Sequence, residues 1–314
     1  MRSRAATKEH ADGGLAMDDI WQYLKSVDDL IASKPIPLGL WGKAIVTWMT
    51  DNFEWFFDGV TVGLKFPIEG AANVLKATPT ALIIIPIIAL IAHRIQRNWI
   101  LTGFVVAGLL LIVNLGLGRE MIETLVMVVS ATFVSLAIGV PIGIICARRP
   151  WLYQALSPVL DMMQTIPTFV YLVPTLIFFG LGMVPGLIAT VIFVVPAPIR
   201  MTYLGISQVQ KALVEAGESF GCTRWQLLTK VKLPAALPTI MAGVNQTIML
   251  SLSMVVIAAL VGADGLGKPV IRALAQANVP LGVVSGLAIV ILAIALDRIM
   301  KQPQRKLTQR PPKA

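Results

Sequence analysis

The stretch EAGESFGCTRWQLLTKVKLP, Glu215 to Pro234, is a polar segment between two apolar runs, residues 162–199 and 234–263. Each run is long enough to cross a bilayer, whose hydrocarbon core of about 30 Å takes roughly 20 apolar residues as a helix. A loop that only joined two membrane helices would need no order of its own. This one carries the sequence signals of two short helices, and we expect it to fold as helix, turn, helix.

The first helix of the loop is predicted over Ser207–Phe220. Gly221 follows it, and glycine is the residue that tolerates the left-handed conformation in which many helices end. A glycine turn is therefore expected at this position. The side chains available for a buried side of this helix are those of Leu204, Val209, Leu213, Ala216 and Phe220.

The second helix of the loop is predicted from Trp225 to about Lys232. Before it, Thr223 to Gln226 has the Ser/Thr-x-x-Glu/Gln form of a capping box, in which side chains satisfy the first free amides of a helix. The dipeptide Leu233-Pro234 is expected to stop the helix, because a residue before proline avoids the helical region. Two capped helices make a compact knob, which suits insertion into a groove of a soluble partner.

The composition around the loop is that of a helical membrane protein. The 314 residues are 56% hydrophobic and 14% charged, with a mean hydropathy of +0.77. Long apolar runs cover residues 77–92, 98–118, 124–147, 162–199, 234–263 and 281–296. The fourth is too long for one crossing and contains GLGMVPG (Gly180–Gly186), where we expect a tight turn between two helices. The predicted fold is all-α and polytopic, with about seven transmembrane helices.

The distribution of charge predicts the orientation of these helices. Lys and Arg concentrate in the connections 93–97, 147–150 and 200–232 and in the C-terminal tail, which the positive-inside rule places in the cytoplasm. Seven spans then leave the N-terminal tail outside, where acidic residues outnumber basic ones. The net charge of +9 therefore reflects topology and not nucleic-acid binding. Both cysteines, Cys146 and Cys222, fall on the cytoplasmic side, where thiols stay reduced.

The N-terminal tail contains an amphipathic segment near residues 40–60. Apolar side chains such as Trp41, Ile45 and Trp48 follow a helical spacing, while Lys43 and Asp51 take the other face. Tryptophan prefers the headgroup region, so we favour a helix that lies on the outer leaflet. An ordinary helix packed on the membrane domain is the alternative.

Uncharged polar residues mark a candidate pathway inside the spans. The fourth run carries Gln164, Thr168, Tyr171 and Thr175 at a spacing that forms one stripe of a helix. In the run 234–263, Gln246 and Ser253 share a face and Asn245 is adjacent. These residues could line a path for a net-neutral solute or could equally form hydrogen bonds between helices. The uncharged interiors of the spans disfavour transport driven by proton titration, although sodium coupling through carbonyl and hydroxyl groups stays open.

The loop resembles a known motif. Glu215-Ala216-Gly217, three residues, Gly221, nine residues and Val231-x-Leu233-Pro234 are similar to the EAA loop (EAA-x3-G-x9-I-x-LP) of permease subunits of ATP-binding-cassette (ABC) importers. Gly217 and Val231 depart from that pattern. Residues 160–186 and 237–262 resemble the permeases of glycine betaine/proline betaine/choline importers, and the similarity covers roughly residues 124–298. By this resemblance the element that couples to the ATPase consists of Glu215, Ala216, Gly217, Gly221, Leu233 and Pro234.

The resemblance also implies an organisation and a set of partners. An extracytoplasmic tail (1–76) and two accessory helices (77–118) precede a permease domain with a MetI-like core of five helices (119–300), its coupling loop (207–234) and a basic tail (301–314). The chain would pair with a second copy, seat its loop on a cytoplasmic ATPase that holds ATP and Mg²⁺, and receive substrate from a binding protein. The substrate would be a quaternary-ammonium osmolyte or amino acid: glycine betaine, proline betaine, choline or proline. No cofactor or catalytic residue is expected on this chain.

Two other hypotheses remain at this point. A passive channel or ion-coupled carrier would account for the polar stripes but not for the loop. A purely structural anchor would use the tryptophan-rich tail and would likewise leave the loop unexplained.

Overall fold

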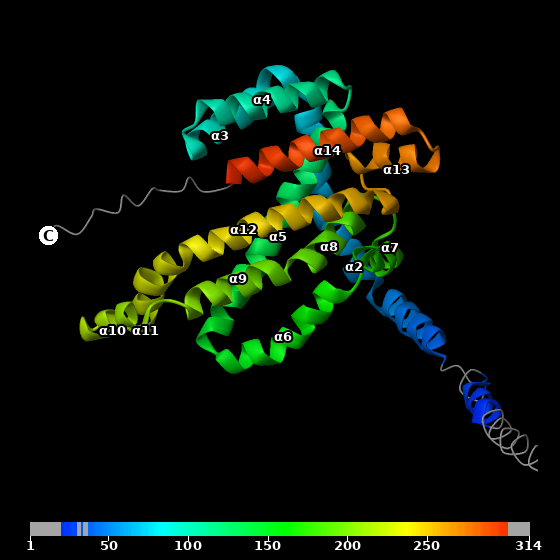
Figure 1. Ribbon diagram of the computed structural model, residues 1–314, viewed down its shortest axis with the longest axis horizontal. Coiled ribbons are helices and arrows are strands. Elements are labelled where there is room, and N and C mark those ends of the chain that lie inside the picture. Colours follow the sequence, from blue (N-terminus) through cyan, green and yellow to red (C-terminus); the bar gives the residue numbers. More distant parts are fainter. Residues whose placement is uncertain (1–19, 30–32, 34–36, 301–314) are drawn as a thin grey trace, which may run out of the picture. The chain divides into compact units, whose positions relative to one another are not determined.

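The computed structural model describes residues 20–29, 33 and 37–300, and every regular element in that part of the chain is a helix (Figure 1). The predicted all-α class is therefore confirmed. After a short helix at residues 20–29 come α2 (Leu38–Ala77), η1 (Thr80–Ile84), α3 (Ile85–Gln96), α4 (Trp99–Asn114), α5 (Gly118–Arg148), α6 (Pro150–Thr165), η2 (Thr168–Tyr171), α7 (Leu172–Phe179), α8 (Met183–Val194), α9 (Pro196–Ser207), α10 (Lys211–Ser219), α11 (Arg224–Gln226), η3 (Leu227–Lys232), α12 (Leu233–Ala258), η4 (Ala259–Val261), α13 (Gly267–Ala275) and α14 (Val279–Met300).

The chain divides into two compact units, Met1–Glu54 and Trp55–Ala314. The boundary lies in α2, one residue after Phe53 leaves helical geometry (φ −121°, ψ 20°). The helix predicted near residues 40–60 is present, but α2 continues to Ala77. In the first unit its side chains of Trp41 and Trp48 are exposed, which suits a membrane surface. The interfacial position itself stays a prediction.

The membrane helices follow the predicted order, but only some are straight. Four helical segments are long and apolar enough to cross a bilayer: Gly118–Arg148, Met183–Ser207, Arg224–Val261 and Val279–Met300. Two further candidate spans are bent pairs, with angles of 96° between Gly39–Ala77 and Thr80–Gln96 and 103° between Pro150–Thr165 and Thr168–Phe179. The described residues thus contain four candidate spans, or up to six with both bent pairs, where about seven were predicted, and α4 is a shorter apolar helix.

Proline accounts for both bends. Pro79 and Pro167 stand at the breaks with extended ψ angles of 106° and 135°. Ile166 is also extended (φ −65°, ψ 128°), as expected for a residue before proline. The turn predicted in GLGMVPG is confirmed, because Gly180 and Gly182 have positive φ angles of 73° and 133° between α7 and α8.

The core of the second unit is a tight packing of α5, α8, α9 and α12, which lie side by side in Figure 1. Close approach of α5 and α9 depends on Gly143. A Cβ atom there would lie 2.7 Å from the carbonyl oxygen of Ile199 and 2.6 Å from Cβ of Thr202. Small residues at helix contacts are the usual device for close packing in membranes.

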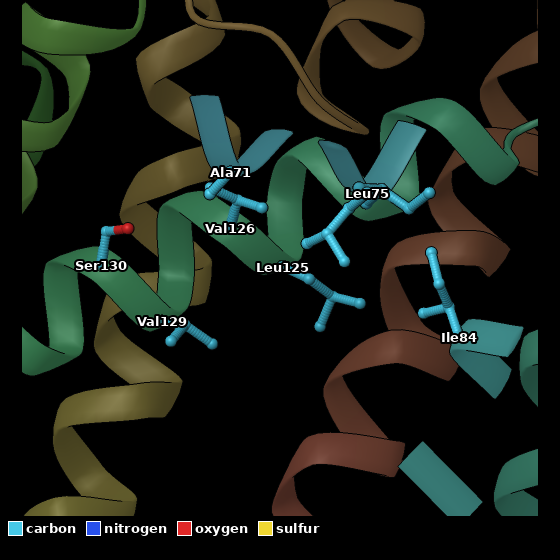
Figure 2. Close-up of a pocket in the computed structure, with 8 residues that line it drawn as sticks. Ala71, Leu75, Ile84, Leu125, Val126, Val129 and Ser130 are labelled. Carbon is cyan, nitrogen blue, oxygen red and sulfur yellow. The ribbon is translucent and has the colours of Figure 1, made fainter. Parts of the chain in front are cut away.

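The second half of α2 packs on this core. The ring of Phe57 stacks on Phe178 of α7 with centroids 4.6 Å apart, and Nζ of Lys76 lies 2.9 Å from Oε1 of Glu123 on α5. Residues from Trp55 onward therefore belong to the same compact unit as the membrane helices, whereas the predicted N-terminal tail extends to residue 76. Beside this contact is an apolar pocket of about 220 Å³, where Leu75, Ile84 and Leu125 converge from α2, η1 and α5 (Figure 2).

Candidate functional site

The coupling loop, residues 207–234, joins α9 to α12. Its first helix is α10, which begins at Lys211, because residues 208–210 separate it from the end of α9 at Ser207. We had expected a helix from Ser207 itself. The interruption makes α10 a separate short element that can turn away from the span before it.

The predicted glycine turn is confirmed. Gly221 has φ +76°, and the amides of Gly221 and Cys222 donate to the carbonyl oxygens of Glu218 (2.9 Å) and Gly217 (3.1 Å). This pair of bonds is the Schellman motif, which satisfies the last free carbonyl groups of a helix. The turn is fixed by backbone geometry.

The predicted capping box is also confirmed. The amide of Gln226 donates to Oγ1 of Thr223 at 3.3 Å, and the Thr223 amide donates to Oε1 of Gln226 at 2.9 Å. Both bonds satisfy amides that the first turn of a helix leaves free. The second half of the loop therefore starts where the sequence places it.

The predicted stop at Leu233-Pro234 is wrong. Leu233 is helical (φ −63°, ψ −46°), and residues Arg224–Val261 form one continuous helical segment. A π-helical segment, η3, precedes the proline. Pro234 has no amide hydrogen and its ring crowds the carbonyl four residues earlier, so the wider turn relieves that crowding and lets the helix continue.

The buried side of α10 also differs from the prediction. Gly217 is its buried residue, and a Cβ there would lie 2.8 Å from Cδ1 of Leu227 in η3. Leu227 and Leu228 are buried beneath the loop, and Leu228 forms a small core with Ile206 and Ala236. The loop is thus held to the ends of α9 and α12 by its second half.

The outer side of the loop exposes three large apolar side chains. The exposed fractions are 46% for Leu213, 89% for Phe220 and 63% for Trp225, and the guanidinium carbon of Arg148 lies 5.4 Å from the Trp225 ring centre. We had expected Leu213 and Phe220 to be buried. Gly217 lies on the side of α10 that packs, where its missing side chain lets Leu227 approach closely.

The coupling residues named from the motif lie together. Glu215 and Ala216 are exposed on α10. Gly217 packs against η3, and Gly221 forms the turn that ends α10. The pair Leu233-Pro234 starts α12. Their arrangement gives one rigid element whose outer surface is available to a partner. Their role in coupling stays a prediction at this point.

The predicted stripe in the fourth run is broken. Gln164 lies on α6, Thr168 and Tyr171 lie in η2, and Thr175 is buried on α7 beyond the 103° bend. The Tyr171 hydroxyl donates to the carbonyl oxygen of Met163 at 2.6 Å, which closes the bend. The predicted stripe required a straight helix, and Pro167 breaks that helix between Gln164 and Thr168.

The candidate pathway residues of α12 divide between two sides. Gln246 and Ser253 are exposed seven residues apart on one helix face. Asn245 points elsewhere: Nδ2 donates to Oδ1 of Asp297 on α14 at 3.5 Å. Asn245 is therefore engaged in a contact between helices, while a pathway role for Gln246 and Ser253 stays a prediction.

Comparison with known proteins agrees with this architecture. The family model "Binding-protein-dependent transport system inner membrane component" matches residues 139–309, which include the coupling loop and the helices that hold it. The chain belongs to this family. It is a polytopic permease subunit of an ABC importer of the inner membrane and not an enzyme.

The relatives are close and cover most of the chain. The glycine betaine transport system permease protein OpuAB of Bacillus subtilis is 46% identical over 275 residues, 88% of this chain and 97% of its own length. The glycine betaine/proline betaine transport system permease protein ProW of Escherichia coli is 44% identical over 267 residues, 84% of this chain and 74% of its own. A solved structure of the MetNI methionine ABC transporter, in an inward-facing conformation, superposes with a TM-score of 0.53 at 26% identity and covers 58% of this chain and 93% of that one.

Proposed function

We propose that this permease imports a quaternary-ammonium osmolyte, with glycine betaine as the first candidate. The observation that carries the proposal is the identity of 46% over 88% of the chain to a permease named for glycine betaine. Two other relatives are named for carnitine and for trimethylamine N-oxide, and both compounds contain a methylated nitrogen, as glycine betaine does. Proline betaine, choline and proline are the alternative substrates.

The energy would come from a partner that docks on the coupling loop. The exposed Phe220 and Trp225, on an element fixed by a glycine turn and a capping box, suit a groove on an ATPase that holds ATP and Mg²⁺. Two copies of the chain, each with one loop, would act together and receive substrate from an extracytoplasmic binding protein. No part of this arrangement requires a cofactor on the permease.

Transport tests the proposal directly. Proteoliposomes that contain the chain, its ATPase and its binding protein should take up labelled glycine betaine only with ATP, and excess unlabelled glycine betaine should block uptake more strongly than proline. Uptake that persists without ATP or without the ATPase would support a channel or ion-coupled carrier instead. ATP-driven uptake of an unmethylated amino acid alone would contradict the substrate class.

Docking is tested by Phe220→Ala. An exposed aromatic anchor in a protein interface contributes about 2 kcal/mol, so ATPase binding should weaken about 30-fold. Phe66→Ala is the matched control, because Phe66 on α2 is 85% exposed against 89% for Phe220. Equal ATPase affinity of the two variants would remove Phe220 from the interface.

The proposed orientation has a built-in reporter. Cys222 lies partly exposed in the coupling loop, and the other cysteine, Cys146, is buried. A membrane-impermeant maleimide should label Cys222 in inverted vesicles and not in intact spheroplasts if the loop is cytoplasmic. The opposite pattern would reverse the proposed orientation of the loop.

A further inference from the structure

A basic cavity of about 460 Å³ lies between the end of α5 and the coupling loop. Arg148 and Arg149 line it at the end of α5, Arg224 lines it from α11 and Lys232 from η3. Glu218 of α10 is the one acidic residue on its wall. Four cations and one carboxylate give this lining a net charge of +3.

None of these four cations forms an ion pair within the described part of the chain, with Glu218 or with any other carboxylate. The ion pairs there are Lys65–Glu69, Lys76–Glu123, Arg200–Asp161 and Lys268–Asp264, all away from the cavity. Arg148 lies over the Trp225 ring, which attracts the cation but carries no net negative charge. Like charges held around one space repel one another, so a bound anion would be favourable.

The position of the cavity indicates the source of that anion. Arg148 is the last residue of the apolar span Gly118–Arg148, and Lys232 immediately precedes the apolar helix α12. The cavity therefore lies at the ends of two candidate spans, on the side where they leave the bilayer and where lipid phosphate groups are found. Its wall also contains Leu227 and Leu228, which gives it an apolar side next to its cations.

We propose that this cavity binds the phosphate group of an anionic phospholipid headgroup. Basic pockets between membrane helices are suited to such groups, and arginine pairs with phosphate through two parallel hydrogen bonds. Two of the cations lie at the end of α5, Arg148 within it and Arg149 directly after it, and two lie in the loop. The bound phosphate therefore links the loop to α5 and stabilises the loop in the conformation described here.

The test measures lipid binding by the purified full-length chain. Native mass spectrometry compares phosphatidylglycerol with phosphatidylcholine of the same acyl chains, and a separate arm adds inorganic phosphate. Each basic residue near a membrane surface contributes about fivefold in affinity for an anionic lipid. Arg149→Gln/Lys232→Gln should therefore weaken phosphatidylglycerol binding about 25-fold. Arg94→Gln/Arg298→Gln removes two exposed cations that do not line the cavity, and it should bind as the wild type does.

A gain of binding separates the proposal from misfolding. Glu218→Gln removes the carboxylate from the wall and should raise phosphatidylglycerol affinity about fivefold, which a damaged fold does not produce. Equal losses in both double variants would overturn the proposal, as would saturation by inorganic phosphate with no preference for phosphatidylglycerol. A third outcome would also overturn the proposal: the wild type binds neither lipid nor phosphate, and Arg149→Gln/Lys232→Gln weakens ATPase binding. The cavity would then face an acidic surface of a partner protein. The measurement uses neither substrate nor ATP, so it is independent of the proposed transport function.

Discussion

Substitutions at Gly221 test the backbone conformation of the glycine turn without disturbing the packing of the coupling loop. Gly221 has φ +76°, and no atom lies within 4 Å of the position that a Cβ would take. Alanine therefore adds no clash and costs only the left-handed conformation, about 1–2 kcal/mol. The equilibrium between a formed and an opened turn would shift by about five- to thirtyfold.

Four variants at this position give a graded series. Asparagine and aspartate tolerate the left-handed region, so Gly221→Asn should lose least, Gly221→Ala more, and Gly221→Val most, because β-branched residues are strained there. Gly221→Asp shares the backbone cost of Gly221→Asn, and the difference between them isolates the added charge. All four should insert into the membrane normally, because the strain is confined to an exposed turn.

The assay pairs a structural with a functional measurement. Hydrogen exchange reports the Cys222 amide, which donates to the Gly217 carbonyl oxygen only when the turn is formed. Reconstituted transporter reports molecules of substrate imported per ATP hydrolysed. Coupling should fall in the same order as protection of that amide. If Gly221→Val imports as much substrate per ATP as the wild type while its Cys222 amide is unprotected, the formed turn is not needed to couple ATP hydrolysis to transport, and the reasoning is refuted.

Three further substitutions test other parts of the structure. Thr223→Ala removes the cap of the second loop helix and should cost about 1 kcal/mol, seen as faster amide exchange at the start of that helix. Gly143→Leu places atoms against the Ile199 carbonyl group, which cannot move, and should lower the thermal stability of the purified chain by more than Gly143→Ala does. Tyr171→Phe removes the hydrogen bond to Met163 and should cost about 0.5–1.5 kcal/mol and loosen the bend between α6 and α7, which spin labels on the two helices would detect; an unchanged distance distribution would contradict that role.

Local signals in the sequence predicted the parts of the site that depend on neighbouring residues. Gly221 and the pair Thr223 and Gln226 act within a few residues of themselves, and all three behave as predicted. Pro167 was also a local signal, for a break in the helix. The predicted stripe was wrong because it assumed a straight helix through this proline.

Packing between elements was beyond the reach of the sequence pattern. Leu213 and Phe220 have the residue types of a buried side, yet α10 packs through Gly217, whose missing side chain lets Leu227 of η3 approach closely. Arg149 and Lys232 are far apart in sequence and line one cavity only because the end of α5 and η3 both border it. A contact of this kind depends on where helices lie and leaves no periodic trace.

The continuous helix through Leu233-Pro234 changes what the coupling loop can do. If the loop helix ended before the proline, the loop could rotate about the break, and its movement would not displace α12. Here one helical segment of 38 residues runs from Arg224 to Val261, about 57 Å at 1.5 Å per residue. At its far end the Val261 carbonyl oxygen accepts a hydrogen bond of 2.9 Å from the amide of Gly182, in the turn that follows the bent span. We therefore predict that a displacement of the loop would move the far end of this segment, and that the turn between α7 and α8 is where such a movement would first alter the bent span.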